Sequence, residues 1–137
     1  MKIYEVTDTS LTKDEFYAMM KNFLVIAKEV LKLDRLPKIK LVDEIIMAGE
    51  QPSFGMYVQG KNILFVSLVN RHPIDILRTM AHELTHYKQD INNELNDNSG
   101  DTGSEQENEA HYMAGIIMRL FAKKYPRYML LSPFKLQ

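Results

Sequence analysis

The segment His82-Glu83-Leu84-Thr85-His86 contains the residues whose types and spacing point most directly to chemistry. If it is helical, its two histidines lie on one face about 6 Å apart, so both imidazoles can reach one metal ion. Glu83 projects about 100° around the helix from His82, beside that metal, where its carboxylate can accept a proton from water. We therefore predict that His82 and His86 bind a metal ion and that Glu83 is a catalytic general base.

The metal that fits this pattern is zinc. The sequence has no cysteine, so any metal site must use histidine and carboxylate ligands, and thiol catalysis and disulfide bonds are excluded. Zinc held in this way lowers the pKa of a bound water to about 7 and polarises a substrate carbonyl. We predict one Zn²⁺ per chain and an enzyme that hydrolyses peptide bonds in a protein or peptide substrate.

A catalytic zinc site needs a third protein ligand and an open position. In one large class the motif continues as HExxHxxGxxH, but this sequence has Gln89 and Asn92 at the last two fixed positions, so that class is excluded. The remaining possibilities lie further along the chain. They are Glu105, Glu107, Glu109 and His111.

The stretch Glu107-Asn108-Glu109-Ala110 resembles the ExxA pattern of gluzincin-type zinc peptidases, in which a glutamate on a later helix completes a His, His, Glu site. The resemblance implies that Glu107 is the third ligand. The small residues Ala110 and Ala114 would let the two helices approach closely. On spacing alone, Ser104 to Glu107 also matches a capping box, in which Glu107 only caps a helix, and Glu105 and Glu109 stay alternative ligands.

More narrowly, a hairpin, the segment AHELTH, the ExxA pattern and an apolar helix resemble the minimal ImmA/IrrE-like peptidase domain, including small phage-encoded relatives. The resemblance covers about residues 54–122. It implies that an extended substrate pairs with the edge strand beside the site, which we expect within 63–68. In that family asparagine often follows ExxA, whereas this chain has His111.

Hydrolysis also needs a donor toward the oxygen that becomes negatively charged. His111 is our preferred catalytic candidate, as that donor or as a residue that positions the ligands, because it shares a helix face with Glu107. A buried histidine with a structural role is the alternative. The other nearby donors are Tyr57, Tyr87 and Tyr112. His72, beside Pro73, is expected at the start of a helix and not at the metal.

The elements that must position these residues can be predicted from periodicity and turn signals. Apolar residues recur at three-to-four spacing from Phe16 to Leu31, after a possible capping box at Thr12 to Glu15, which predicts a helix. Gly60-Lys61-Asn62 between two apolar segments predicts a hairpin. Helices are expected over 12–33, 73–91 and 104–125, strands over 2–6, 38–42, 54–59 and 63–68, and a polar surface loop over 92–104.

These elements predict an α+β fold over residues 1–137 as one zincin-like metallopeptidase domain. Its small sheet should be mostly antiparallel, with the motif on one helix and Glu107 on another. Lys and Arg total 17 against 18 Asp and Glu, which leaves a net charge of -1 and gives no reason to expect nucleic acid or a membrane as partner. The sequence shows neither a signal-peptide core nor a membrane-spanning apolar run, so we expect a cytoplasmic protein.

Two other functions fit parts of the pattern. A zinc-binding regulatory or interaction module could keep the zincin fold with little hydrolysis, although pure metal binding does not require the base Glu83. A zinc hydrolase of non-peptide amides is the weaker alternative, because the deformylase form of HExxH uses a cysteine ligand that this chain lacks.

Overall fold

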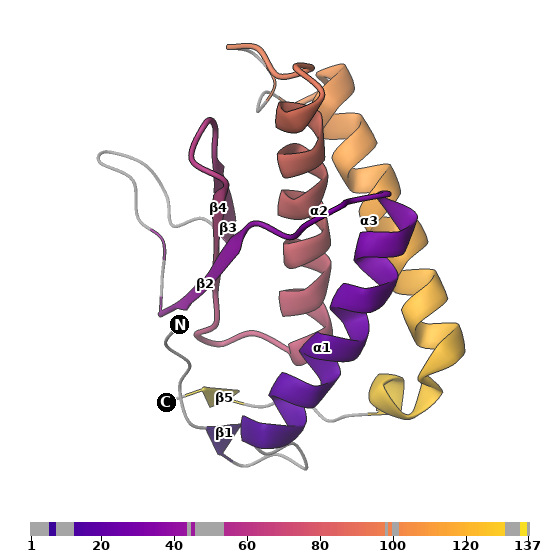
Figure 1. The fold of residues 1–137 in the computed structure, drawn as a ribbon. Helices are drawn as coiled ribbons and strands as arrows, with labels where there is room; N and C mark the ends of the chain where they lie inside the picture. The colour runs from indigo at the N-terminus through magenta and orange to yellow at the C-terminus, as the bar shows by residue number, and fades with distance from the viewer. Residues whose placement is uncertain are drawn as a thin grey trace.

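The computed structural model describes residues 6–7, 13–43, 45, 54–97, 99, 102–130 and 135–136. Its three long helices and a three-stranded sheet confirm the α+β class (Figure 1). The helices are α1 (Lys13–Val30), α2 (Pro73–Ile91) and α3 (Glu105–Lys124), followed by the 3₁₀ helix η1 (Pro126–Leu130). The strands are β1 (Val6–Thr7), β2 (Lys38–Val42), β3 (Gly55–Val58), β4 (Ile63–Ser67) and β5 (Lys135–Leu136).

Two strands near the ends of the chain form a separate small sheet. β1 pairs with β5 in antiparallel register, Val6 opposite Leu136. Of the strand expected over 2–6, all but Val6 lies outside the described residues, and so does Thr12 of the expected capping box.

The predicted hairpin is confirmed, because β3 and β4 pair antiparallel across the turn at Gly60 to Asn62. Gly60 and Asn62 adopt positive φ angles of 80° and 52°, which glycine and asparagine tolerate best. The expectation of a mostly antiparallel sheet is wrong: β2 pairs parallel with β4, so the sheet is mixed. The reason is the strand order β2-β4-β3, in which the second hairpin strand inserts beside β2 after two reversals of chain direction.

The same strand order corrects the predicted edge strand. Residues 63–68 contain β4, which is the central strand and is hydrogen-bonded on both sides. The sheet edge that lies toward the motif helix is β3, which contacts α2. A substrate strand could therefore pair with β3 but not with β4.

The predicted amphipathic character of the first helix is confirmed. The residues of its apolar stripe are buried in the core or packed against it. Fully buried members include Phe16, Phe23 and Leu31, and Phe23 meets Phe121 of α3 edge-to-face with ring centroids 6.0 Å apart. This packing fixes α1 against the outer side of the helix pair that carries the motif.

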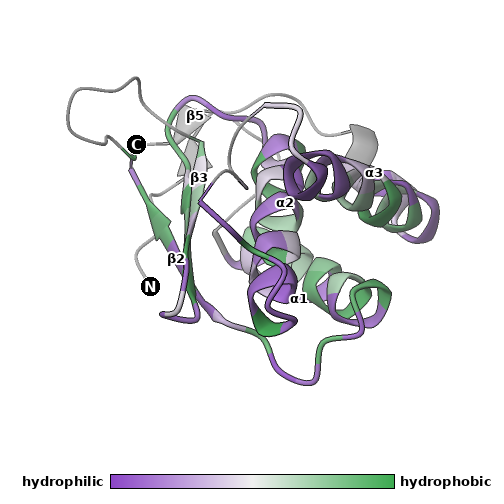
Figure 2. Ribbon diagram, turned by 90° about the horizontal axis from the view of Figure 1, so that it is seen from above, coloured by the Kyte–Doolittle hydropathy of each residue, from purple (hydrophilic) through white to green (hydrophobic). Residues whose placement is uncertain are grey.

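Helix α2 lies between the sheet and the other two helices (Figures 1 and 2). Its predicted apolar face is confirmed, since Leu77, Met80, Ala81 and Leu84 are all fully buried. His72 caps its start: the His72 Nδ1 accepts the Ile74 N–H at 3.1 Å, which confirms the expected place of this residue. Within the described ranges, no helix has both the length and the apolar composition needed to cross a lipid bilayer.

Candidate metal centre

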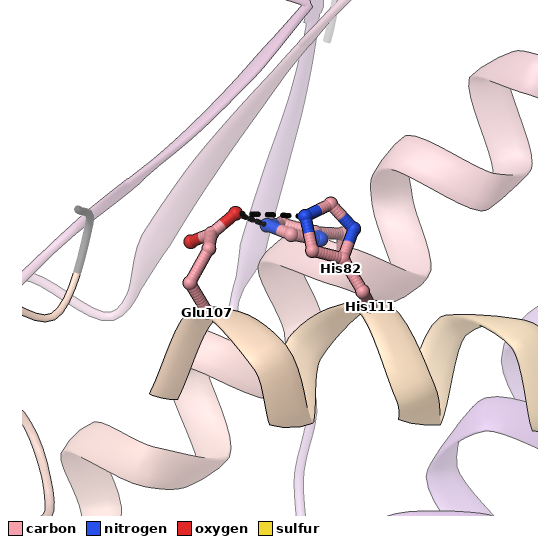
Figure 3. A group of neighbouring side chains, drawn as sticks. All are labelled: His82, Glu107 and His111. Carbon is pink, nitrogen blue, oxygen red and sulfur yellow. Dashed lines mark ion pairs between the residues drawn. The ribbon is translucent and has the colours of Figure 1, made fainter. Parts of the chain in front are cut away.

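Two pairs of polar side chains face each other between α2 and α3. His82 and His86 lie one turn apart on α2, and Glu107 and His111 lie one turn apart on α3. The Glu107 Oε1 is 2.8 Å from the His82 Nε2 and 3.4 Å from the His111 Nε2, as drawn in Figure 3. The Glu107 Oε2 is 3.1 Å from the His86 Nε2. Three imidazoles thus surround one carboxylate.

The most compact part of this group is not the predicted His, His, Glu set. Ligand atoms of His82, Glu107 and His111 all lie within 4.8 Å of one another, and His86 joins them through the second carboxylate oxygen of Glu107. The His82 ring contacts both other imidazoles, with centroids 4.9 Å from His86 and 4.6 Å from His111. The structure therefore brings together the predicted ligands His82, His86 and Glu107 and the candidate His111.

Among the three glutamates at the start of α3, Glu107 is the one whose described carboxylate contacts these histidines. Glu105 is exposed, and the Glu109 Oε1 accepts a bond from Gln89 at 2.7 Å. The Ser104 Oγ accepts the Glu107 backbone N–H at 3.1 Å, so Ser104 caps the helix as its spacing predicts. Because this bond uses only the Glu107 backbone, the cap leaves the Glu107 carboxylate beside the histidines.

Gln89 is a residue of this site that the sequence reasoning missed. Its side chain is 1% exposed and bridges the two helices. The Gln89 Nε2 donates to the Gln106 carbonyl at 3.0 Å and to Glu109, which leaves its Oε1 to face the His86 Nδ1 at 2.8 Å. Its signal was present: Gln89 follows His86 by three residues and is polar on a buried helix face.

The bonds of Gln89 fix the role of each His86 nitrogen. Since the Gln89 Oε1 can only accept, the His86 Nδ1 must carry a hydrogen and donate it. In neutral His86 the Nε2 then presents a lone pair toward the Glu107 Oε2, only 3.1 Å away. Two facing acceptors are stabilised by a positive charge between them, either a proton or a metal ion.

His82, the other motif histidine, favours its neutral form. Burial lowers the pKa of His82 below its ordinary value, and the Glu107 carboxylate opposes that effect only in part. Neutral imidazoles that face a carboxylate are the ligand set that zinc takes from proteins without cysteine. The residues present therefore fit a zinc ion.

Glu83 lies beside this group. No ion pair joins it to another residue that the structure describes. It is 8% exposed, and burial together with the nearby charge of Glu107 raises its pKa to about 8. The Tyr57 backbone N–H on β3 donates to its carboxylate and opposes this rise. A buried carboxyl that titrates near neutrality can both accept and return a proton.

Gly55 allows β3 to come this close to Glu83. A Cβ at this position would lie 2.5 Å from the Thr79 Cγ2 and 3.0 Å from the Glu83 Cγ, which no ordinary packing allows. Glycine at this position lets the strand backbone approach the motif helix.

A cleft of about 710 Å³ opens over this group, a size typical of ligand sites. β3 forms one wall, and α2 and α3 form the floor and the opposite side. Leu95, Asn96 and Ser99 of the polar segment 92–104 also line it, so part of the expected surface loop is a wall of the site.

The structure separates the four donors considered for the oxyanion. The Tyr87 side chain is buried and donates to the Arg35 carbonyl at 3.2 Å, and exposed Tyr112 is not part of the cleft lining. Tyr57 lines the cleft, but its hydroxyl donates to Asp90, and burial and this carboxylate raise its pKa. His111 lines the cleft with a side chain that is 69% exposed.

Two side chains that the sequence reasoning passed over fasten the hairpin to α2. At one end, buried Arg71 donates to the carbonyls of Phe54 and Ser67 at 3.4 and 3.0 Å, and to the Asp75 carbonyl at 2.9 Å. At the other end, the Asp90 carboxylate accepts from the Tyr57 hydroxyl and, at 2.8 Å, from the Gly60 N–H. We call these two sets of bonds the Arg71 and Asp90 ties.

Comparison of the chain with protein-family models, with curated proteins and with solved structures gives no match.

Proposed function

We propose that this protein is a zinc-dependent peptidase with a zincin-like fold. The observation that carries the proposal is the convergence of His82, His86 and Glu107 from two facing helices, next to the buried carboxyl of Glu83. A metal site alone needs no additional buried acid. Its presence at the floor of an open cleft favours hydrolysis over simple metal storage.

In this proposal His82, His86 and Glu107 hold one zinc ion. When bound, zinc supplies a Lewis acid that polarises the substrate carbonyl and makes water acidic enough to attack near neutral pH. Gln89 holds His86 in the tautomer whose Nε2 lone pair points to Glu107 and the site. Small Ala110 and Ala114, both buried, keep α3 close to α2.

Glu83 moves the proton. Its carboxylate takes a proton from the attacking water and then passes it to the nitrogen of the leaving amine. Burial raises the pKa of this carboxyl in the metal-free protein, and a nearby zinc ion would oppose that rise and favour the carboxylate that accepts the proton. His111, at the open side of the cleft, donates toward the oxygen that becomes negative.

The substrate is an extended peptide that pairs with β3. The Ser67 N–H donates to the Phe54 carbonyl, so by alternation the backbone groups of Gly55 and Tyr57 point away from β4 toward the cleft. The bond from the Tyr57 N–H to Glu83 agrees with this direction. A peptide added at this edge would pass across the proposed metal position with its carbonyls beside Glu83.

The first test is elemental analysis of protein purified without chelator. We expect about one zinc per chain in the wild type and its loss or marked weakening in His86→Ala and Glu107→Ala. Glu105→Ala is the matched control, because Glu105 is exposed on the same helical turn and should keep the zinc. A wild type that stays metal-free when supplied with zinc would refute the proposal.

The second test separates hydrolysis from binding. Glu83→Gln should retain zinc but lose at least about a hundredfold in peptide hydrolysis, the usual contribution of a general base. Peptide libraries and small amides would be assayed in parallel. Full retention of a biological effect or partner binding by Glu83→Gln, with no peptidase activity in the wild type, would instead support a zinc-binding interaction module.

A further inference from the structure

His111 is in excess of what a three-ligand zinc site needs, yet it lies within that site. Its Nε2 is 3.4 Å from the same Glu107 oxygen that contacts His82, and its ring lies against the His82 ring. Glu107 and His111 on α3 mirror the spacing of His82 and His86 on α2. Metal sites between helices are known to be built from ligands that project inward from facing helices.

The distances at the Glu107 Oε1 are close to those between ligands of one ion. Zinc ligands at about 2.0 to 2.1 Å in a tetrahedron lie about 3.3 Å from one another. The Glu107 Oε1 is 2.8 Å from the His82 Nε2 and 3.4 Å from the His111 Nε2, whereas the His86 Nε2 faces the other oxygen, Oε2, at 3.1 Å. His111 thus approaches the same carboxylate oxygen as the motif residue His82, and it belongs to the compact group of possible ligand atoms within 4.8 Å of one another.

We propose that His111 is a fourth protein ligand that closes the metal site in the resting protein and leaves when substrate enters. This inference rests on the metal binding proposed above. It adds a resting state in which His111 occupies the position that substrate or water would need. A zinc ion with four protein ligands has no open position, so hydrolysis requires one ligand to depart. The structure indicates which one that is.

His111 is the ligand that is held least firmly. Its side chain is 69% exposed, against 15% for His82 and 12% for His86. Gln89 anchors His86 from behind, whereas the contacts of the His111 ring among the described residues are with Glu107 and His82, at the site itself. The exposed ring can therefore rotate toward solvent without breaking bonds elsewhere, and it then lies beside the substrate as the donor proposed above.

The experiment measures metal binding, not turnover. Zinc affinity would be determined by chelator competition, and the visible absorption of the Co²⁺-substituted protein recorded, for wild type, His111→Ala and His111→Asn. We expect both variants to bind zinc at least about tenfold more weakly, the loss seen even for partners that only orient a ligand. Their Co²⁺ spectra should change in shape and intensity, because water replaces an imidazole.

Tyr112→Ala is the matched control, since Tyr112 neighbours His111, is equally exposed and does not line the cleft. It should keep the wild-type affinity and spectrum. If His111→Ala also keeps both while His86→Ala loses the metal, the fourth-ligand proposal is overturned and the three-ligand site stands. A wild type that binds neither Zn²⁺ nor Co²⁺ would overturn both.

Discussion

In the absence of metal, the surroundings of Glu83 disfavour the ionised form of its carboxyl. Its carboxyl is 8% exposed and faces the negative charge of Glu107. Its pKa, raised to about 8 from 4.5, means that folding disfavours the ionised form by a few kcal/mol at neutral pH. Such a residue destabilises the fold that it serves.

We therefore predict that Glu83→Gln stabilises the metal-free protein. At neutral pH the buried Glu83 must take up a proton when the chain folds, because its pKa rises from 4.5 to about 8. The amide is neutral in both states and its oxygen can still accept the Tyr57 N–H, so the free energy of unfolding should rise by about 1 to 3 kcal/mol at neutral pH. Urea unfolding in the presence of a chelator measures this change. Exposed Glu105→Gln should stay within about 0.5 kcal/mol of the wild type. A less stable Glu83→Gln protein would contradict the prediction.

Gln89 gives the second prediction at the level of single residues. Gln89→Leu removes the acceptor that orients His86, so zinc affinity should fall by about 10- to 100-fold. Chelator competition measures the affinity. Glu109→Ala is the control: it removes one partner of Gln89 but leaves the bond that the His86 Nδ1 donates to the Gln89 Oε1. Equal zinc affinities in the wild type, Gln89→Leu and Glu109→Ala would show that Gln89 connects the two helices but does not affect zinc binding.

Single residues differ in how far the sequence could reveal them. The spacing of His82, Glu83 and His86 is local and could be predicted, because one helical turn relates them. The place of Glu107 could be narrowed to three glutamates but not fixed, since the approach of α3 to α2 depends on packing. The spacing of Gln89 from His86 is local, but its role as a bridge between the helices could not be predicted, because Gln106 and Glu109 are 17 and 20 residues away in the chain.

Among the elements, β3 and α2 approach each other closely at Gly55. Gly55→Ala would place a methyl group against Thr79 and Glu83, so the strand must shift or the side chains must move. We predict a loss of about 1 to 3 kcal/mol in the free energy of unfolding, the usual effect of overpacking, with a weakened peptidase activity. Thermal unfolding and peptide assays check both.

Gly115→Ala is a matched control for Gly55→Ala. Gly115 lies inside α3, and a Cβ there would meet no atom within 4 Å. The substitution should stabilise the protein by up to about 1 kcal/mol, because alanine is the better helix former. A Gly55→Ala protein as stable as Gly115→Ala would mean that the strand has room to move.

The elements themselves were predictable in kind but not in arrangement. The three helices and the β3–β4 hairpin follow from apolar periodicity and turn residues within single segments. The position of β4 between β2 and β3 does not, because it depends on which strand edge pairs with which. The sequence therefore predicted neither the mixed sheet nor the correct edge strand, because both depend on pairing between distant segments.

At the scale of the whole molecule, the proposed metal would connect α2 to α3, the two helices that share the largest interface. At this end α2 and α3 meet through polar groups, whereas elsewhere the fully buried Ile117 and Phe121 of α3 belong to the common core. We predict that zinc raises the free energy of unfolding by about 2.7 kcal/mol when free zinc is 100 times its Kd, and that a chelator reverses the gain.

Thermal unfolding with zinc, with chelator and after zinc is restored measures this effect. His86→Ala should show a much smaller zinc-induced rise, because it lacks a ligand and binds zinc more weakly. A zinc-induced rise of equal size in His86→Ala would place the stabilising ion elsewhere on the molecule. At this scale the sequence predicted the α+β class, but the cleft wall built from residues 92–104 required the folded arrangement.

The Arg71 and Asp90 ties fasten the hairpin to α2 near both ends of the helix. The hairpin that forms the cleft wall is therefore held firmly against the helix that carries the motif. The width of the cleft is fixed before a ligand binds. Recognition would then require little ordering of the protein, so the entropy lost on binding comes mainly from the ligand. Peptides that are already extended would associate faster than folded or helical ones of the same composition.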